Sequence, residues 1–143
     1  MCRRAVRGRP RPGEPETAVA GRLPSPDAWL GPAAMASAAR DPDIRIEPAW
    51  KVSLVYGMPC AVYHQFPAAY YLAARFRDDF ESAVLHAVNG GGQNQARAML
   101  AGALAGAQVG LAGIPRRFID GLERGEQCLA QARRLAVQLA AEH

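Results

Sequence analysis

The residues with the clearest chemical potential form a short uncharged loop, NGGGQNQA, at positions 89–96. Three consecutive glycines allow the backbone to bring its N–H groups close to a ligand. They are followed by the side-chain amides of Gln93, Asn94 and Gln95, which offer hydrogen-bond donors and neutral oxygen acceptors. The pattern is typical of a ligand-binding loop, but it lacks the charged groups that such loops usually carry.

The chemistry that this loop favours is the binding of a phosphate or pyrophosphate oxygen. The N–H groups of Gly91 and Gly92 can approach an anion, and a helix that begins near Asn94 points its positive end at the same place. The alternative is that the glycines only end one helix and lead into the next, because a C-cap and a turn favour the same residues. The candidate ligand-binding residues are Asn89, Gly91, Gly92, Gln93, Asn94 and Gln95.

The helix before the loop has a well-defined start and end in the sequence. Asp78 or Asp79 is a typical N-cap, because a carboxylate there accepts hydrogen bonds from the first helical N–H groups. Apolar residues then follow at helical spacing from Phe80 to Val88. Asn89 and the glycines end the pattern, so a helix over roughly these residues is predicted.

A second helix is predicted from about Asn94 to Leu111. Gly102, Gly106 and Gly110 recur every four residues on one face, which lets another backbone approach closely. This spacing, together with the absence of charge from residues 98–115, is also found in membrane-spanning helices. Because alanine and glycine dominate the segment and it contains a glutamine, a buried helix is favoured over a membrane span.

Most of the remaining segments also indicate helix, so the sequence predicts an all-α protein. Residues 59–76 read as a helix that Pro67 breaks or kinks, and residues 115–125 as a short helix. The last segment places apolar residues between Cys128 and Leu139 along one stripe, as in an amphipathic closing helix. Residues 42–56 are ambiguous between extended chain and a short helix.

The N-terminal part differs in composition from the rest of the chain. Residues 1–40 are predicted to be a disordered extension rich in arginine and proline, and residues 41–143 to be the folded domain. The net charge of +4 is located in residues 1–22, where six arginines stand against two glutamates. Residues 23–143 are therefore neutral, and no basic face is expected for nucleic acid.

The three cysteines, Cys2, Cys60 and Cys128, are far apart in the sequence. Their spacing matches neither a zinc site nor a disulfide framework, so they are interpreted as buried or free thiols in a reducing compartment. A cytoplasmic location is predicted on that basis. Targeting to an organelle by the arginine-rich start is the alternative, although its prolines disfavour an amphipathic transit helix.

The text of residues 78–122 resembles the ADP-ribosylglycohydrolase family. The shared features are a capped helix, an N-x-G-G loop, a helix of small residues and an Ile-Pro pair, in that order. Enzymes of this family remove ADP-ribose from modified protein side chains, and their fold is all-α. The resemblance implies an orthogonal helical bundle of the same type over residues 41–143. The family also includes structural eye-lens proteins, so resemblance alone does not imply catalysis.

The resemblance also identifies what the loop lacks. In the family the loop usually reads G-G-D-T-D-T, and its two aspartates hold a pair of magnesium ions that position ADP-ribose. When Gly91 and Gly92 are aligned with these glycines, Gln93 and Gln95 occupy the aspartate positions. Two close dications require anionic ligands to offset their repulsion, and amide oxygens carry no charge. No metal ligand and no catalytic residue is therefore predicted here.

Two functions follow as hypotheses. The resemblance implies hydrolysis of a glycosidic bond to ADP-ribose, and the missing aspartates predict that this chain is inactive in that reaction. The alternative is a non-catalytic helical protein that binds an ADP-ribose-like or nucleotide ligand, or has a structural or interaction role. Residues 1–77 lack the family's G-D-A-x-G and T-D-D-T motifs. A truncated domain is therefore expected, with a missing N-terminal half or a second copy of the chain as partner.

Overall fold

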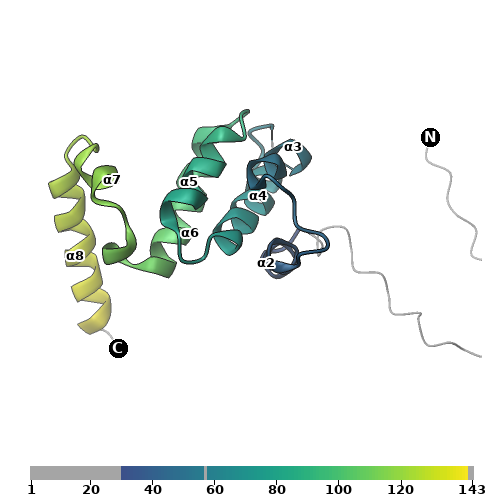
Figure 1. Ribbon diagram of the computed structural model, residues 1–143. Helices are drawn as coiled ribbons and strands as arrows, with labels where there is room; N and C mark the ends of the chain where they lie inside the picture. Colours follow the sequence, from purple (N-terminus) through teal and green to yellow (C-terminus); the bar gives the residue numbers. More distant parts are fainter. Residues whose placement is uncertain (1–29, 57, 142–143) are drawn as a thin grey trace, which may run out of the picture.

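The computed structural model describes residues 30–56 and 58–141, and within them every regular element is helical (Figure 1). The all-α fold predicted from the sequence is confirmed. The elements in chain order are α2 (Pro32–Arg40), the 3-10 turn η1 (Ala49–Lys51), α3 (Val52–Tyr56), α4 (Val62–Arg75), α5 (Phe80–Asn89), α6 (Asn94–Val109), the 3-10 turn η2 (Leu111–Gly113), α7 (Arg116–Asp120) and α8 (Gly125–Ala141).

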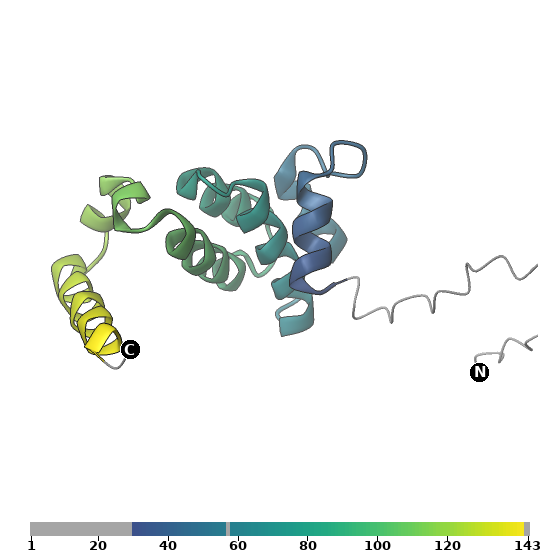
Figure 2. The ribbon, with the colours of Figure 1, turned by 90° about the horizontal axis from the view of Figure 1, so that it is seen from below.

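Helix α4 is the centre of the packed part of the molecule. It contacts α2 on one side and α5 and α6 on the other, while α3 packs against it as well (Figures 1 and 2). The core between these helices is built mostly from alanine, so it brings the backbones close together and contains few large side chains. The buried core cluster is Met35, Ala39, Ala49, Val52, Ala68, Ala69, Tyr71, Leu72, Ala87 and Ala101.

Helix α2 lies inside the range that was predicted to be disordered. Met35 and Ala39 are four residues apart on one face, and each is only 1% exposed where α2 packs against α4. Pro32 stands at the start of the helix, where a missing N–H costs no hydrogen bond. The prediction of disorder is therefore wrong for residues 32–40. Residues 1–29 of that prediction lie outside the described residues.

The ambiguous segment between α2 and α4 is helical where it touches the core. It forms η1 and α3, and Val52 is fully buried. The Ile46 N–H donates a hydrogen bond of 2.7 Å to the hydroxyl of Tyr71, which ties the preceding loop to α4. Burial of this tyrosine raises the pKa of its hydroxyl. Helix α4 itself runs through Pro67 without the predicted break.

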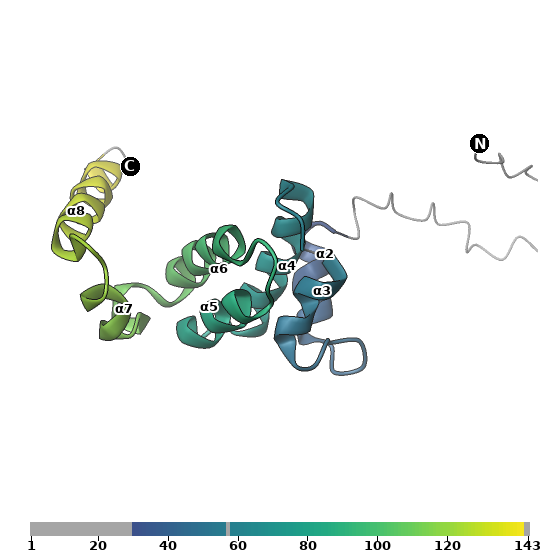
Figure 3. The same ribbon diagram turned by 90° about the horizontal axis from the view of Figure 1, so that it is seen from above.

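Two of the glycines that recur every four residues, Gly102 and Gly106, lie on the face of α6 that meets α5, although a Cβ atom at either position would make only ordinary van der Waals contacts. The two helices lie side by side (Figure 3). A Cβ atom at Gly102 would stand 3.4 Å from the Val84 side chain, and one at Gly106 would stand 3.7 Å from Phe80. Gly110 has a different role, because it ends α6 with a positive φ of 68°.

Helix α8 stands apart from this group, whereas α7 contacts α5 through the edge-on pair Phe118–Phe80 and the ion pair Arg117–Glu81 (Figures 1 and 3). Among the described residues, α8 packs chiefly against α7, and none of its residues is buried. The amphipathic stripe predicted for this helix is present, but Leu135 and Leu139 on it remain 57% and 51% exposed. None of the helices in residues 30–56 and 58–141 combines the length and the apolar character needed to span a membrane.

The N-cap of α5 offers a direct test of the helix that leads into the loop. The Asp79 carboxylate accepts hydrogen bonds from the Ser82 hydroxyl at 2.5 Å and the Ser82 N–H at 3.0 Å. We expect Asp79→Ala to lower the free energy of unfolding by roughly 1 kcal/mol, because the first N–H groups of the helix lose their acceptor. Thermal or urea unfolding measures this, and an unchanged midpoint contradicts it.

The same carboxylate makes the cap dependent on pH. Hydrogen bonds from the Ser82 side chain, and then from its backbone, lower the pKa of Asp79 below its ordinary value of 3.8. Its stabilising contribution is therefore fully present above that value and is lost as the pH falls through the lower pKa of the folded state. Asp79→Asn keeps an uncharged acceptor. We expect the stability difference between wild type and Asp79→Asn to shrink on acidification, as measured by unfolding at neutral and acidic pH.

Candidate functional site

The glycine loop connects the end of α5 directly to the start of α6. Gly90 is the C-cap of α5 and is buried, whereas Gly91 and Gly92 have positive φ angles of 66° and 60°. This left-handed conformation is rarely adopted by residues with a Cβ atom. The predicted arrangement of helix end, glycine turn and new helix start is therefore confirmed.

The three glycines of the loop differ in how much room each has for a Cβ atom. A Cβ atom at Gly90 would stand 2.2 Å from the hydroxyl oxygen of Ser53, which lies on α3. One at Gly92 would stand 2.6 Å from the carbonyl oxygen of Met58, whereas one at Gly91 would find nothing closer than 3.9 Å. The Gln93 N–H donates to the same Met58 carbonyl at 3.1 Å. Two of the three glycines thus allow close packing, whereas the third has room for a Cβ atom at an ordinary contact distance.

The N-terminus of α6 lies open beside these glycines. Its N-cap residue Gln93 makes no side-chain capping bond, and the first turn carries no acidic residue. The first backbone bond runs from the Arg97 N–H to the Gln93 carbonyl, so the N–H groups of residues 94–96 have no partner inside the helix. These donors carry the positive end of the helix dipole.

The predicted ligand residues are therefore neighbours, but the side chain of one of them already makes a hydrogen bond within the protein. The side-chain amide of Asn94 donates a hydrogen bond of 3.2 Å to the Val88 carbonyl, which closes the loop against the end of α5. Asn89, Gln93 and Gln95 are exposed. Their side chains are accessible to a ligand on the outer side of the loop.

Arg97 is the residue at this site that the sequence analysis missed. Its side chain is completely buried, with a relative exposure of 0%. Its Nε donates to the Ala87 carbonyl at 3.0 Å and its Nη2 to the Gly91 carbonyl at 2.6 Å. The sequence spacing could have indicated this burial. Arg97 stands four and eight residues before the buried Ala101 and Ala105, and it shares their face of α6.

Burial has an electrostatic consequence for this arginine. Desolvation lowers the pKa of Arg97 from its ordinary value. An arginine side chain in a protein nevertheless keeps its proton at neutral pH. A cation is therefore fixed directly beneath the glycine loop.

Comparison of the sequence with known protein families identifies one family. A family model described as ADP-ribosylglycohydrolase matches residues 1–143. The chain belongs to the ADP-ribosylglycohydrolase family. No curated protein and no solved structure matches it significantly. The family resemblance read from residues 78–122 is confirmed.

The donor set at the loop does not fit the magnesium pair of the ADP-ribosylglycohydrolases. Within residues 30–56 and 58–141, no three side chains of histidine, cysteine, aspartate or glutamate come together in a way that would hold a metal ion. Gln93 and Gln95 contribute neutral amides, and Arg97 contributes a positive charge. Because magnesium favours anionic oxygen ligands, this loop offers it poor coordination and electrostatic repulsion.

A polar cavity of about 460 Å³ runs along α5, and Asn89 lies at its end. Asp79, Ser82 and His86 share this face of the helix. Asp79 is already occupied by its two bonds from Ser82, and the His86 ring stacks on Phe76 at 4.7 Å between centroids. The other acidic residue of the lining, Glu81, pairs with Arg117. Both acidic groups therefore already have structural partners, and the cavity extends from one of the predicted ligand residues.

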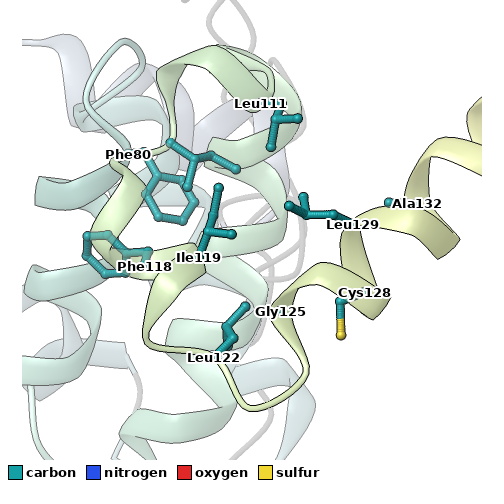
Figure 4. A pocket seen from close by; sticks show the side chains of 10 residues that line it. Phe80, Leu111, Phe118, Ile119, Leu122, Gly125, Cys128, Leu129 and Ala132 are labelled. Carbon is teal, nitrogen blue, oxygen red and sulfur yellow. The ribbon is translucent and has the colours of Figure 1, made fainter.

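A second cavity, of about 360 Å³, lies between the start of α5, η2, α7 and α8 (Figure 4). Phe80, Phe118 and Leu129 point into it, and its lining is almost entirely apolar. It offers no polar group to orient a substrate. Gly91 and Gly92 do not line it, so it is separate from the glycine loop.

The different surroundings of two neighbouring glycines yield a matched test of the loop. Gly91→Ala and Gly92→Ala introduce the same methyl group at nearly the same φ, which costs roughly 1–2 kcal/mol of unfolding free energy at either position. Only Gly92→Ala also places that group against the Met58 backbone. We expect Gly92→Ala to be clearly more destabilising in urea unfolding. Equal unfolding midpoints for the two variants would show that the Met58 contact is not formed.

Proposed function

We propose that this chain is a non-catalytic member of the ADP-ribosylglycohydrolase family that binds an ADP-ribose-like ligand through its glycine loop, without magnesium. The loop would hold the pyrophosphate of the ligand. Asn89, Gln93 and Gln95 would add neutral hydrogen bonds to ribose or phosphate oxygens. Asn94 would contribute mainly its backbone N–H, since its side chain binds the Val88 carbonyl.

The observation that carries this proposal is the set of unsatisfied backbone donors at the start of α6. The N–H groups of residues 94–96 have no partner inside the helix, and no acidic side chain occupies its first turn. Gly91 and Gly92 turn the chain immediately before these donors. A helix N-terminus that follows a glycine turn favours a phosphate oxygen, both by hydrogen bonding and by the helix dipole.

The same residues argue against hydrolysis by the metal-dependent route of the family. That route requires carboxylates at the positions of Gln93 and Gln95, where this chain has amides. Asp79, an acidic residue on the same cavity as Asn89, caps α5 through its bonds from Ser82. A structural or interaction role without any ligand is the alternative function.

Calorimetric titration with ADP-ribose tests the proposed function. We expect wild type to bind with the same affinity in the presence of magnesium and in excess chelator, because no ligand bond depends on the metal. Gly92→Val should weaken binding by about tenfold or more, equivalent to at least about 1.4 kcal/mol. Gln108→Ala, an exposed change near the far end of α6, is the matched control and should bind as wild type does.

The outcomes separate the two functions from each other and from catalysis. Binding that requires magnesium, accompanied by release of ADP-ribose from a modified protein, would overturn the non-catalytic proposal. Absence of binding by folded wild type would leave the structural or interaction role. Equal affinities of wild type and Gly92→Val would show that the ligand binds elsewhere.

A further inference from the structure

The Arg97 guanidinium determines which way the loop's peptide groups face. It lies beneath the loop, fully buried, and its Nη2 donates to the Gly91 carbonyl at 2.6 Å. The peptide between Gly91 and Gly92 is trans, because the only cis peptide among the described residues joins Glu47 and Pro48. In a trans peptide the carbonyl and the following N–H point in opposite directions. The Gly92 N–H is therefore directed away from Arg97.

Three further contacts prevent the loop from turning over. The Arg97 Nε donates to the Ala87 carbonyl in the last turn of α5, which fixes the guanidinium plane. Gly90 packs so closely on this group that a Cβ atom there would lie 2.9 Å from its Nη2. The Gln93 N–H is held by the Met58 carbonyl. Reversal of the Gly91–Gly92 peptide would leave the guanidinium without one of its acceptors in a buried site.

We propose that Arg97 is a positioning residue that holds the Gly91–Gly92 peptide with the Gly92 N–H outward, so that the loop accepts phosphate groups and repels divalent cations. This inference rests on the proposed function, because it concerns the same loop. It adds the reason why the site would work without metal. The charge that magnesium supplies in the family would come here from a side chain fixed inside the fold.

Inorganic pyrophosphate, titrated into the isotope-labelled full chain, is the first probe. In wild type we expect the largest NMR shift changes at the amides of Gly92 and residues 94–96. Arg97→Lys keeps a charge but loses the planar fork, and should weaken pyrophosphate binding about tenfold. Arg97→Met removes the charge as well, and should weaken it on the order of a hundredfold. Arg116→Met, at an exposed arginine on α7, is the matched control and should leave binding unchanged.

Folding of each variant is checked by circular dichroism and by the amide spectrum of α4. A purely structural role for Arg97 predicts lower melting temperatures with equal pyrophosphate affinity in the folded Lys and Met variants, and that result would overturn the proposal. If Arg97→Met does not fold, Arg97→Gln replaces it, because its amide still donates but carries no charge. If neither folds, shift changes in wild type that avoid Gly92 and residues 94–96 would also overturn the proposal.

A second experiment tests whether Arg97 repels divalent cations, independently of any phosphate ligand. Gln93→Asp with Gln95→Asp restores two carboxylates, and binding of Mn²⁺ alone is followed by electron paramagnetic resonance. We expect the further change Arg97→Met, or Arg97→Gln, to tighten Mn²⁺ binding at least about tenfold, because it removes a cation from beneath the site. Equal affinity with and without Arg97, including no binding in either, would overturn the claim that Arg97 repels cations.

The two experiments fail in distinguishable ways. If folded wild type binds neither ADP-ribose nor pyrophosphate, the proposed function is wrong, and the Mn²⁺ comparison still decides the electrostatic role of Arg97. If wild type binds both and the Arg97 variants bind equally well, the proposed function stands and the role assigned to Arg97 is wrong.

Discussion

The packing of this helical domain at its glycine loop depends on one buried guanidinium. Arg97, on α6, donates to the Ala87 carbonyl at the end of α5 and to the Gly91 carbonyl in the loop. It thereby connects α6 to α5 and to the loop in which the chain reverses direction. The last carbonyls of a helix have no partner inside it, and a buried charge is costly unless it is hydrogen-bonded. The arginine and the carbonyls satisfy each other, which fixes where α6 begins relative to α5.

Small residues make this arrangement possible. Ala101 and Ala105 are fully buried on α6, on the same face as Arg97, while Gly102 and Gly106 face α5. The long Arg97 side chain reaches the Ala87 carbonyl at the end of α5. A core of alanine and glycine gives less apolar burial per residue than a core of leucine. The hydrogen bonds of the buried arginine are correspondingly important for the α5–α6 pair.

Local signals in the sequence predicted much of the fold, whereas tertiary contacts determined what was missed. The cap at Asp79, the glycine turn and the helical periodicity of α5 and α6 act within a few residues, and all are confirmed. Helix α2 was missed because the proline-rich composition before it obscured one buried face, centred on Met35. Arg97 was missed because composition places arginine on surfaces, and only a partner carbonyl ten residues earlier explains its burial.

The amides that replace the aspartates of the family loop and the buried Arg97 have the same electrostatic effect. A loop that holds magnesium needs carboxylates and carbonyl oxygens directed at the ion, whereas a loop that holds phosphate needs N–H groups directed at it. Replacement of aspartates by Gln93 and Gln95 removes negative charge from the outer side. Arg97 draws the Gly91 carbonyl inward and adds positive charge beneath. Under the proposed function, the neutral amides and Arg97 together make this backbone turn unsuited to a cation, and its exposed donors accept an anion.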